Sequence, residues 1–120
     1  MLYHLALDRE WQEALAAGEY RTSTLGARLE DVGFLHAAFA DQVQGVADRY
    51  YAQVAEPVVL LVIDESRLTV PWRVDVAPDG HGYPHVYGPL RPEAVVRVVP
   101  VRPDPRGGLA VRLPDDPHGT

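Results

Sequence analysis

Three of the five histidines lie where an imidazole ring could act on a ligand. His4 lies in the segment YHL, His36 in FLHA and His85 in PHVYG, each among aromatic or aliphatic neighbours, whereas His81 and His118 lie among glycine and proline. An imidazole is costly to bury without a hydrogen-bond partner, so its repeated placement in apolar segments needs an explanation. Sheets bring distant strand residues into one cleft, and we therefore predict that the three rings converge on a shared binding site.

A purely structural interpretation competes with that prediction. A core histidine satisfies its ring N–H with a backbone carbonyl or a hydroxyl, and for any one of the three taken alone this interpretation is favoured. Three neutral imidazoles can also bind zinc, but these three are 32 and 49 residues apart, and no two of them pair as HxH, HxxxH or HExxH. We therefore predict no metal site.

Other catalytic motifs are missing from the sequence. Ser23 and Ser66 are the only serines, and neither lies in a GxSxG nucleophile elbow. No Walker A or GxGxxG sequence offers a backbone cradle for phosphate. Adjacent acids occur at 30–31, 64–65 and 115–116, but neighbouring side chains usually point apart, so these acids are more typical of solvated ends of elements than of an acid–base pair.

Composition bounds the class of protein. The chain has 120 residues, 47% of them hydrophobic, which suits one core and one domain. It has no cysteine, so disulfides, thiolate zinc sites and thiol nucleophiles are excluded. A net charge of −6 with eleven scattered arginines argues against nucleic acid as a partner. No secretory signal is visible, and no apolar run approaches the roughly 18 residues of a membrane helix, so we expect a cytoplasmic protein outside the membrane.

The first histidine lies in an apolar segment that we predict to be a strand, residues 2–6. Asp8 is placed to cap a helix in which apolar residues recur at helical spacing from Trp11 on, and Gly18 ends it. A mixed polar segment and a less regular passage follow, and we predict a loop or a short helix there, up to residue 31.

The second histidine lies in residues 34–37, which we predict to be a strand. A long helix is predicted after it, because apolar residues recur every three or four positions as Phe39, Val43, Val46, Ala47, Tyr50 and Val54. Pro57 closes that helix. Residues 58–63 are six consecutive apolar residues rich in β-branching, which predicts a strand buried on both faces.

The third histidine lies in the segment GYPHVYGPL, residues 82–90. Two prolines restrict its backbone, and in an extended segment His85 and Tyr87 are two residues apart and point the same way. We predict that they form one wall of the cleft of the other two histidines, with Gly88 beside them. A turn at Pro84 would separate the two side chains.

The rest of the chain is predicted to be mostly strands and turns. A shorter strand or edge strand with a proline is predicted at 69–74, a turn at 78–82, a tight turn or single helical turn at 90–93, a strand at 94–101, a hairpin connection at 103–108 and a closing strand at 109–113. The predicted fold is a single α+β domain over residues 1–113, followed by a flexible tail at 114–120.

Six tyrosines offer aromatic surfaces for stacking: Tyr3, Tyr20, Tyr50, Tyr51, Tyr83 and Tyr87. Tyr50 and Tyr51 cannot both face inward from one helix, so we predict that one is core and the other lies at the surface or cleft. Trp11 and Trp72 are predicted to be core residues.

The motifs LYHLA, GEYR after a tryptophan, GFLHAAFADQVQGVADRYY and YPHVYGPL follow one another within about residues 2 to 101. Their order resembles a small bacterial family called domain of unknown function nine hundred and fifty-two. That family is distantly similar in fold to the ADP-ribosyltransferases, and the two histidine motifs are similar to those of RNA 2′-phosphotransferases in that superfamily. The resemblance implies about two helices packed on a central, largely antiparallel split β-sheet.

The resemblance also implies roles for individual residues. His4 would hold the nicotinamide ribose of NAD and His36 would lie near the bound dinucleotide, which makes both catalytic candidates. The implied cofactor-binding residues are Tyr3, His85, Tyr87 and Gly88. The family more often has a hydroxyl residue just after the second histidine, where this chain has Ala37 and Ala38. No residue matches the third, often acidic, catalytic position.

Three functions remain open at this stage. The first is a binding module for a nucleotide or sugar phosphate, as an inactive relative of the ADP-ribosyltransferases. The second is an active NAD-consuming transferase or hydrolase, whose oxocarbenium-like transition state needs positioned hydrogen bonds on the ribose and a stacking aromatic ring. The third is a structural or interaction protein without a small-molecule ligand. The sequence names no substrate and no oligomeric state.

Overall fold

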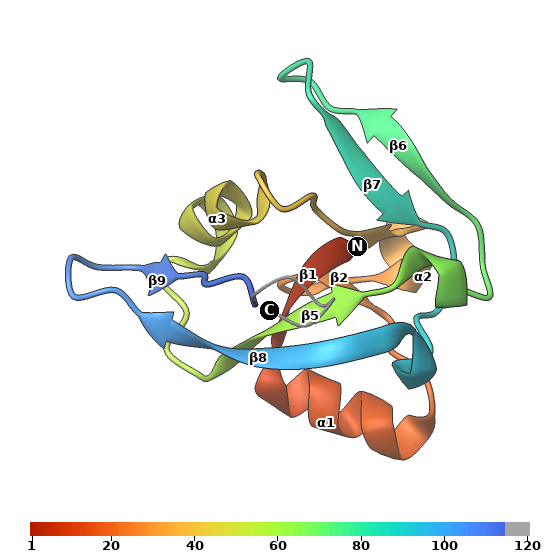
Figure 1. Ribbon diagram of the computed structural model, residues 1–120, viewed down its shortest axis with the longest axis horizontal. Helices are drawn as coiled ribbons and strands as arrows, with labels where there is room; N and C mark the ends of the chain where they lie inside the picture. The colour runs from red at the N-terminus through yellow and green to blue at the C-terminus, as the bar shows by residue number, and fades with distance from the viewer. Residues whose placement is uncertain (115–120) are drawn as a thin grey trace.

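The two most apolar segments of the sequence lie side by side in the main sheet (Figure 1). The computed structural model describes residues 1–114, so the predicted tail lies almost wholly outside the described residues. Strand β1 (Leu2–Leu7) pairs antiparallel with β5 (Val58–Ile63), which pairs antiparallel with β8 (Val95–Pro103). Strand β9 (Leu109–Ala110) continues this sheet in the order β1-β5-β8-β9. All six residues of β5 are buried, which confirms the predicted two-sided strand.

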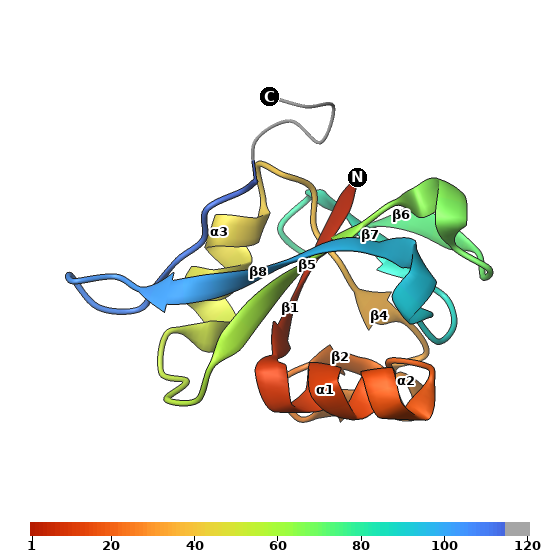
Figure 2. The same ribbon diagram turned by 60° about the horizontal axis from the view of Figure 1, so that its bottom comes forward.

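The main sheet has a separate core of buried residues on each of its faces, and Figure 2 shows helices on different sides of this sheet. Alternate residues of a strand point to opposite faces. Val59, Leu61 and Ile63 of β5 therefore pack with the side that carries helix α1 (Asp8–Ala17), as part of one cluster of buried residues. The other three residues of β5 pack in a second cluster with helix α3 (Val43–Val46).

A smaller antiparallel sheet carries His36 and His85. Its strands are β4 (Leu35–His36), β7 (Gly82–Val86) and β6 (Trp72–Val76), in the order β4-β7-β6. β6 is an edge strand, as predicted, but it begins at Trp72, after the proline on which the prediction rested. The β6–β7 hairpin extends away from the main sheet (Figure 1), and a bridge between Tyr3 and Ala38 joins the two sheets.

The remaining elements are short. Residues 22–32, predicted to be a loop or a short helix, form a two-stranded hairpin and one helical turn, namely β2 (Thr22–Thr24), β3 (Ala27–Arg28) and α2 (Leu29–Val32). Two short 3-10 turns follow β5 and precede β8, namely η2 (Glu65–Arg67) and η3 (Pro92–Ala94). The chain is thus a small α+β domain with a curled antiparallel sheet and few helices. No helix within residues 1–114 combines the length and the apolarity needed to cross a membrane.

Helix α1 ends as predicted but begins differently. Gly18 adopts a left-handed φ of 86° and its N–H donates to the carbonyl of Ala14, which is the usual glycine stop. Asp8 does not cap the helix, because it lies inside the first turn, where the helix dipole favours its negative charge. Trp11 is buried, as predicted.

The predicted long helix after β4 begins later than expected, is π-helical in its second half and ends at Tyr51, before the predicted stop at Pro57. Residues 39–42 form a turn instead, because the side-chain oxygen of Gln42 accepts from the Phe39 N–H and its amide nitrogen donates to the carbonyl of Gly82. Helix α3 then passes into a π-helical segment, η1 (Ala47–Tyr51). Tyr51 is buried and Tyr50 is 45% exposed, which confirms the prediction that only one of the two tyrosines faces the core.

Candidate functional site

His4 is a buried side chain, 4% exposed, and both of its ring nitrogens have partners. Nδ1 lies 2.5 Å from the backbone oxygen of His36, and Nε2 lies 3.0 Å from the hydroxyl of Tyr20. Burial lowers the pKa of His4 to about 4, so the ring is neutral near pH 7. A carbonyl only accepts, so Nδ1 carries the proton and Nε2 accepts from Tyr20. This is the structural arrangement that a single core histidine was expected to show.

His36 and His85 meet on the smaller sheet, as predicted. They are cross-strand partners in the β4–β7 pair, and their ring centroids are 4.9 Å apart at an interplanar angle of 76°. The N–H of His36 donates to the hydroxyl oxygen of Ser23 at 3.0 Å, which ties β4 to β2. Burial, and next the neighbouring His85, lower the pKa of His36. His4 joins this pair through the backbone of His36 and not through ring contact.

The segment with His85 is extended, so His85 and Tyr87 point the same way, with ring centroids 6.5 Å apart. Nδ1 of His85 lies 2.8 Å from Oδ2 of Asp75, and the Tyr87 hydroxyl donates a short hydrogen bond to the same oxygen. Phe34 stacks on the His85 ring at 3.9 Å. Hydrogen bonds, first from Tyr87, lower the pKa of Asp75. These contacts hold the His85 ring against His36 in a fixed orientation.

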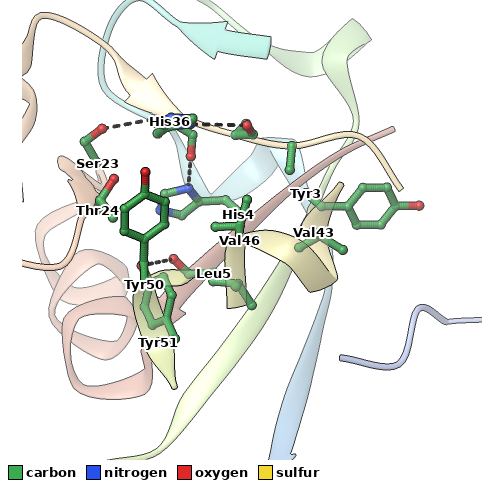
Figure 3. Close-up of a pocket in the computed structure, with 12 residues that line it drawn as sticks. Tyr3, His4, Leu5, Ser23, Thr24, His36, Val43, Val46, Tyr50 and Tyr51 are labelled. Carbon is green, nitrogen blue, oxygen red and sulfur yellow. Dashed lines mark hydrogen bonds between the residues drawn. The ribbon is translucent and has the colours of Figure 1, made fainter. Parts of the chain in front are cut away.

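A narrow pocket with a free volume of about 10 Å³, room for about one water molecule, lies beside β1, and we call it the inner pocket (Figure 3). Its lining comes from β1, β2, β4 and the α3–η1 segment: Tyr3, His4, Leu5, Ser23, Thr24, His36, Ala37, Ala38, Val43, Val46, Tyr50 and Tyr51. The structure therefore brings His4, His36 and Tyr3 to one pocket. The ring of Tyr3 points away from the other labelled side chains (Figure 3).

A second and wider space of about 330 Å³ adjoins the inner pocket, and we call it the outer hollow. It lies between η1 and the turn of the β6–β7 hairpin and is lined by His36, Val46, Arg49, Tyr50, Ala77, Pro78, Asp79 and Tyr83. His36, Val46 and Tyr50 line both spaces. His36 therefore lies at their junction.

Three of the residues predicted to bind a cofactor line neither space. His85 and Tyr87 reach the site only through the contact of His85 with His36. Gly88 packs against Val70, and a Cβ at this position would lie 2.5 Å from Cγ1 of that valine. The close packing of Val70 explains a glycine at position 88 without a ligand.

Several site residues were not predicted from the sequence: Ser23, Thr24, Arg49, Asp75 and Asp79. The position of Asp75 could have been predicted from the sequence. A hairpin that turns at 78–82 places Val76 opposite Gly82, so Asp75 lies on the same face of the sheet as His85. Ser23 carried no local signal, since its partner is a backbone N–H thirteen residues away. Within residues 1–114, no group of three or more His, Asp or Glu side chains is arranged to hold a metal ion.

These features define the protein as a small α+β domain with a curled antiparallel sheet and a pocket at the junction of its two sheets. The chain belongs to the family described as protein of unknown function DUF952, whose sequence profile matches residues 5–98. The family predicted from the motifs is thereby confirmed.

The fold is similar to that of protein CC0527 from Caulobacter crescentus. In the crystal structure of CC0527, the sequence is 26% identical to that of this chain. The two folds match with a TM-score of 0.79 over 91% of this chain and 92% of the CC0527 chain. Its solution NMR structure gives 27% identity and a TM-score of 0.71 over 89% of each chain. A comparison with proteins of curated function finds no match.

Proposed function

We propose that this protein binds a nucleotide or a sugar phosphate, with the sugar against His36 in the outer hollow. The observation that carries this proposal is the convergence of His36, Tyr83 and Tyr50, from β4, β7 and η1, on one hollow of about 330 Å³ that is otherwise mainly apolar. Small-molecule sites typically have this composition, an apolar lining with a few convergent polar groups. Sugar hydroxyls both donate and accept, which matches hydroxyl and neutral imidazole groups.

His36 is the central binding residue in this proposal. Its lowered pKa keeps the ring neutral near pH 7, so that one nitrogen donates and the other accepts. His4 acts as a positioning residue, because it holds the backbone carbonyl of His36. Asp75 and His85 position the His36 ring from the other side.

The resemblance to the ADP-ribosyltransferases supports NAD or an ADP-ribose fragment as the ligand, and we propose that the fold is related to theirs. Two histidines from the expected strand motifs line the same pocket. Turnover is disfavoured, because both nitrogens of His4 are already bonded and Ala37 and Ala38 supply no hydroxyl. The protein is therefore proposed to be a binding module of that superfamily rather than an NAD-consuming enzyme.

The test uses NAD, ADP-ribose and ribose 5-phosphate, with binding measured by calorimetry and nicotinamide release measured by chromatography. We expect saturable binding without release, lost in His36→Ala and kept in His81→Ala, which removes an exposed imidazole from the hairpin turn. Release that depends on His36 would instead establish an active NAD-consuming enzyme. Binding of none of the three compounds would favour a structural or interaction protein.

A further inference from the structure

The outer hollow contains a guanidinium group that the proposed sugar site does not use. Arg49 lies on the exposed side of η1, and it is the only arginine lining either the inner pocket or the outer hollow as described. Its guanidinium carbon lies 5.9 Å from the ring centroid of Tyr50. Tyr50, and next Tyr83, raise the pKa of Arg49, so its charge is permanent. A cation is thus held in the outer hollow, in the same lining as His36.

The carboxylates near Arg49 are engaged elsewhere. None of the ion pairs found within residues 1–114 includes Arg49. Asp48 accepts from the side-chain amide of Gln44 at 2.9 Å. Asp79, on the hairpin side of the hollow, accepts from the backbone N–H of His81 at 2.8 Å and from the Tyr83 hydroxyl at 3.1 Å. Arg49 therefore has no ion-pair partner within residues 1–114, and its contacts with Tyr50 and Tyr83 leave its positive charge unpaired.

We propose that Arg49 anchors the phosphate group of a sugar phosphate in the outer hollow while the sugar packs against His36 in the same hollow. This inference rests on the proposed function of the outer hollow, and it names the class of ligand, a sugar carrying a phosphate monoester or diphosphate. Arginine binds phosphate through several N–H donors, and the hydroxyl of Tyr50 adds a donor to the same hollow. His36 lies at the junction of both spaces and contacts the sugar next to the phosphate.

Asp79 fixes the side of the hollow on which the phosphate lies. Its carboxylate is charged near pH 7, because the hydrogen bonds from His81 and Tyr83 lower its pKa. A phosphate beside Asp79 would meet like charge, so the phosphate lies on the side of Arg49 and Tyr50. Two single substitutions of opposite effect follow from this geometry. Removing the cation weakens the binding of a phosphorylated sugar, and neutralising the carboxylate strengthens it.

The experiment titrates ribose 5-phosphate, ribose and inorganic phosphate into the full chain, with binding measured by NMR chemical-shift changes. For ribose 5-phosphate, we expect Arg49→Gln to weaken affinity by about tenfold or more, as for the loss of one charged hydrogen bond. Asp79→Asn, which keeps an acceptor for the turn, should strengthen it by a few-fold. Ribose affinity should not change in either variant. Arg97→Gln is the matched control, because Arg97 is exposed on β8, far from the hollow in sequence and outside its lining.

The outcomes separate this inference from the proposed function. If ribose 5-phosphate binding depends on His36 but responds equally to Arg49→Gln and Arg97→Gln, the phosphate site is wrong and the sugar site stands. If inorganic phosphate binds in an Arg49-dependent way while ribose and its phosphate show no His36 dependence, the sugar site is wrong and the phosphate site stands. Binding of none of the three probes at millimolar concentration overturns both.

Discussion

Acid should destabilise this protein well above the pH at which its carboxylates titrate, because His4 has to stay neutral in the folded state. Burial sets the pKa of His4 at about 4 in the fold, against 6.5 for an unperturbed histidine. The unfolded chain therefore binds a proton at His4 more readily than the folded chain does. Stability from this residue is fully present above about pH 6.5 and is lost as the pH falls toward about 4.

The size of the effect follows from the two pKa values. Their difference corresponds to about 3 kcal/mol of unfolding free energy, most of it lost by about pH 4.5. His36 contributes in the same direction, since its pKa is also lowered. Carboxylates with lowered pKa values, such as Asp75 and Asp79, lose their contributions at lower pH. A comparison with a variant that lacks only the His4 imidazole cancels these other contributions.

Urea unfolding of the wild type and of His4→Gln, each at about pH 7.5 and about pH 4.5, measures the His4 contribution. The variant is expected to be less stable at the higher pH, but its loss between the two pH values should be smaller by about 2 to 3 kcal/mol. Equal losses in the two proteins would show that His4 protonates in the folded state. The buried, doubly bonded ring on which the account of the site depends would then be wrong.

Two further predictions concern packing beside the site. Gly88→Ala should destabilise the fold by about 1 to 3 kcal/mol in urea unfolding, because the added Cβ would lie 2.5 Å from Cγ1 and 2.8 Å from Cβ of Val70. The loss caused by Gly88→Ala should be smaller in a Val70→Gly background, which removes both of these atoms. An equal loss in both backgrounds would refute this contact. Tyr51→Phe should cost about 1 to 2 kcal/mol, because the Tyr51 hydroxyl donates to the buried carbonyl of Leu5 at 3.1 Å. Tyr50→Phe is its control and should have little effect, since the Tyr50 side chain is exposed, and equal effects of the two substitutions would contradict the reasoning.

The sequence predicted those parts of the fold that depend on neighbouring residues. The β-branched run of residues 58–63 and the glycine stop at Gly18 are local signals, and the structure has both features. The predicted start of the second helix was wrong. The apolar residues from Phe39 on have helical spacing, but the side chain of Gln42 ties residues 39–42 to β7. A hydrogen bond between residues forty positions apart has no periodic signal in the sequence.

The site was predictable only where strand alternation applies. His85 and Tyr87 were correctly placed on one face, because a side-chain period of two follows from an extended backbone. Whether a histidine in an apolar strand faces a ligand or a core partner depends on a distant residue. For His4 that residue is Tyr20, sixteen positions away and without a motif that links the two. The segment YHL looks the same whether His4 faces a ligand or a core partner, so the sequence does not distinguish the two arrangements.

The bonding of His4 also decides which histidine can reach a ligand. A ligand hydroxyl can hydrogen-bond to Nε2 of His4 only if the Tyr20 hydroxyl gives up its own hydrogen bond to that nitrogen. Breaking this buried hydrogen bond costs about 1 to 3 kcal/mol. His36 is partly exposed, lies at the junction of both spaces and requires no such exchange. A ligand should therefore bind first through His36. Tyr20→Phe, which frees Nε2 of His4, should then leave affinity for ribose 5-phosphate almost unchanged, and a large gain in affinity would show that His4 binds the sugar directly.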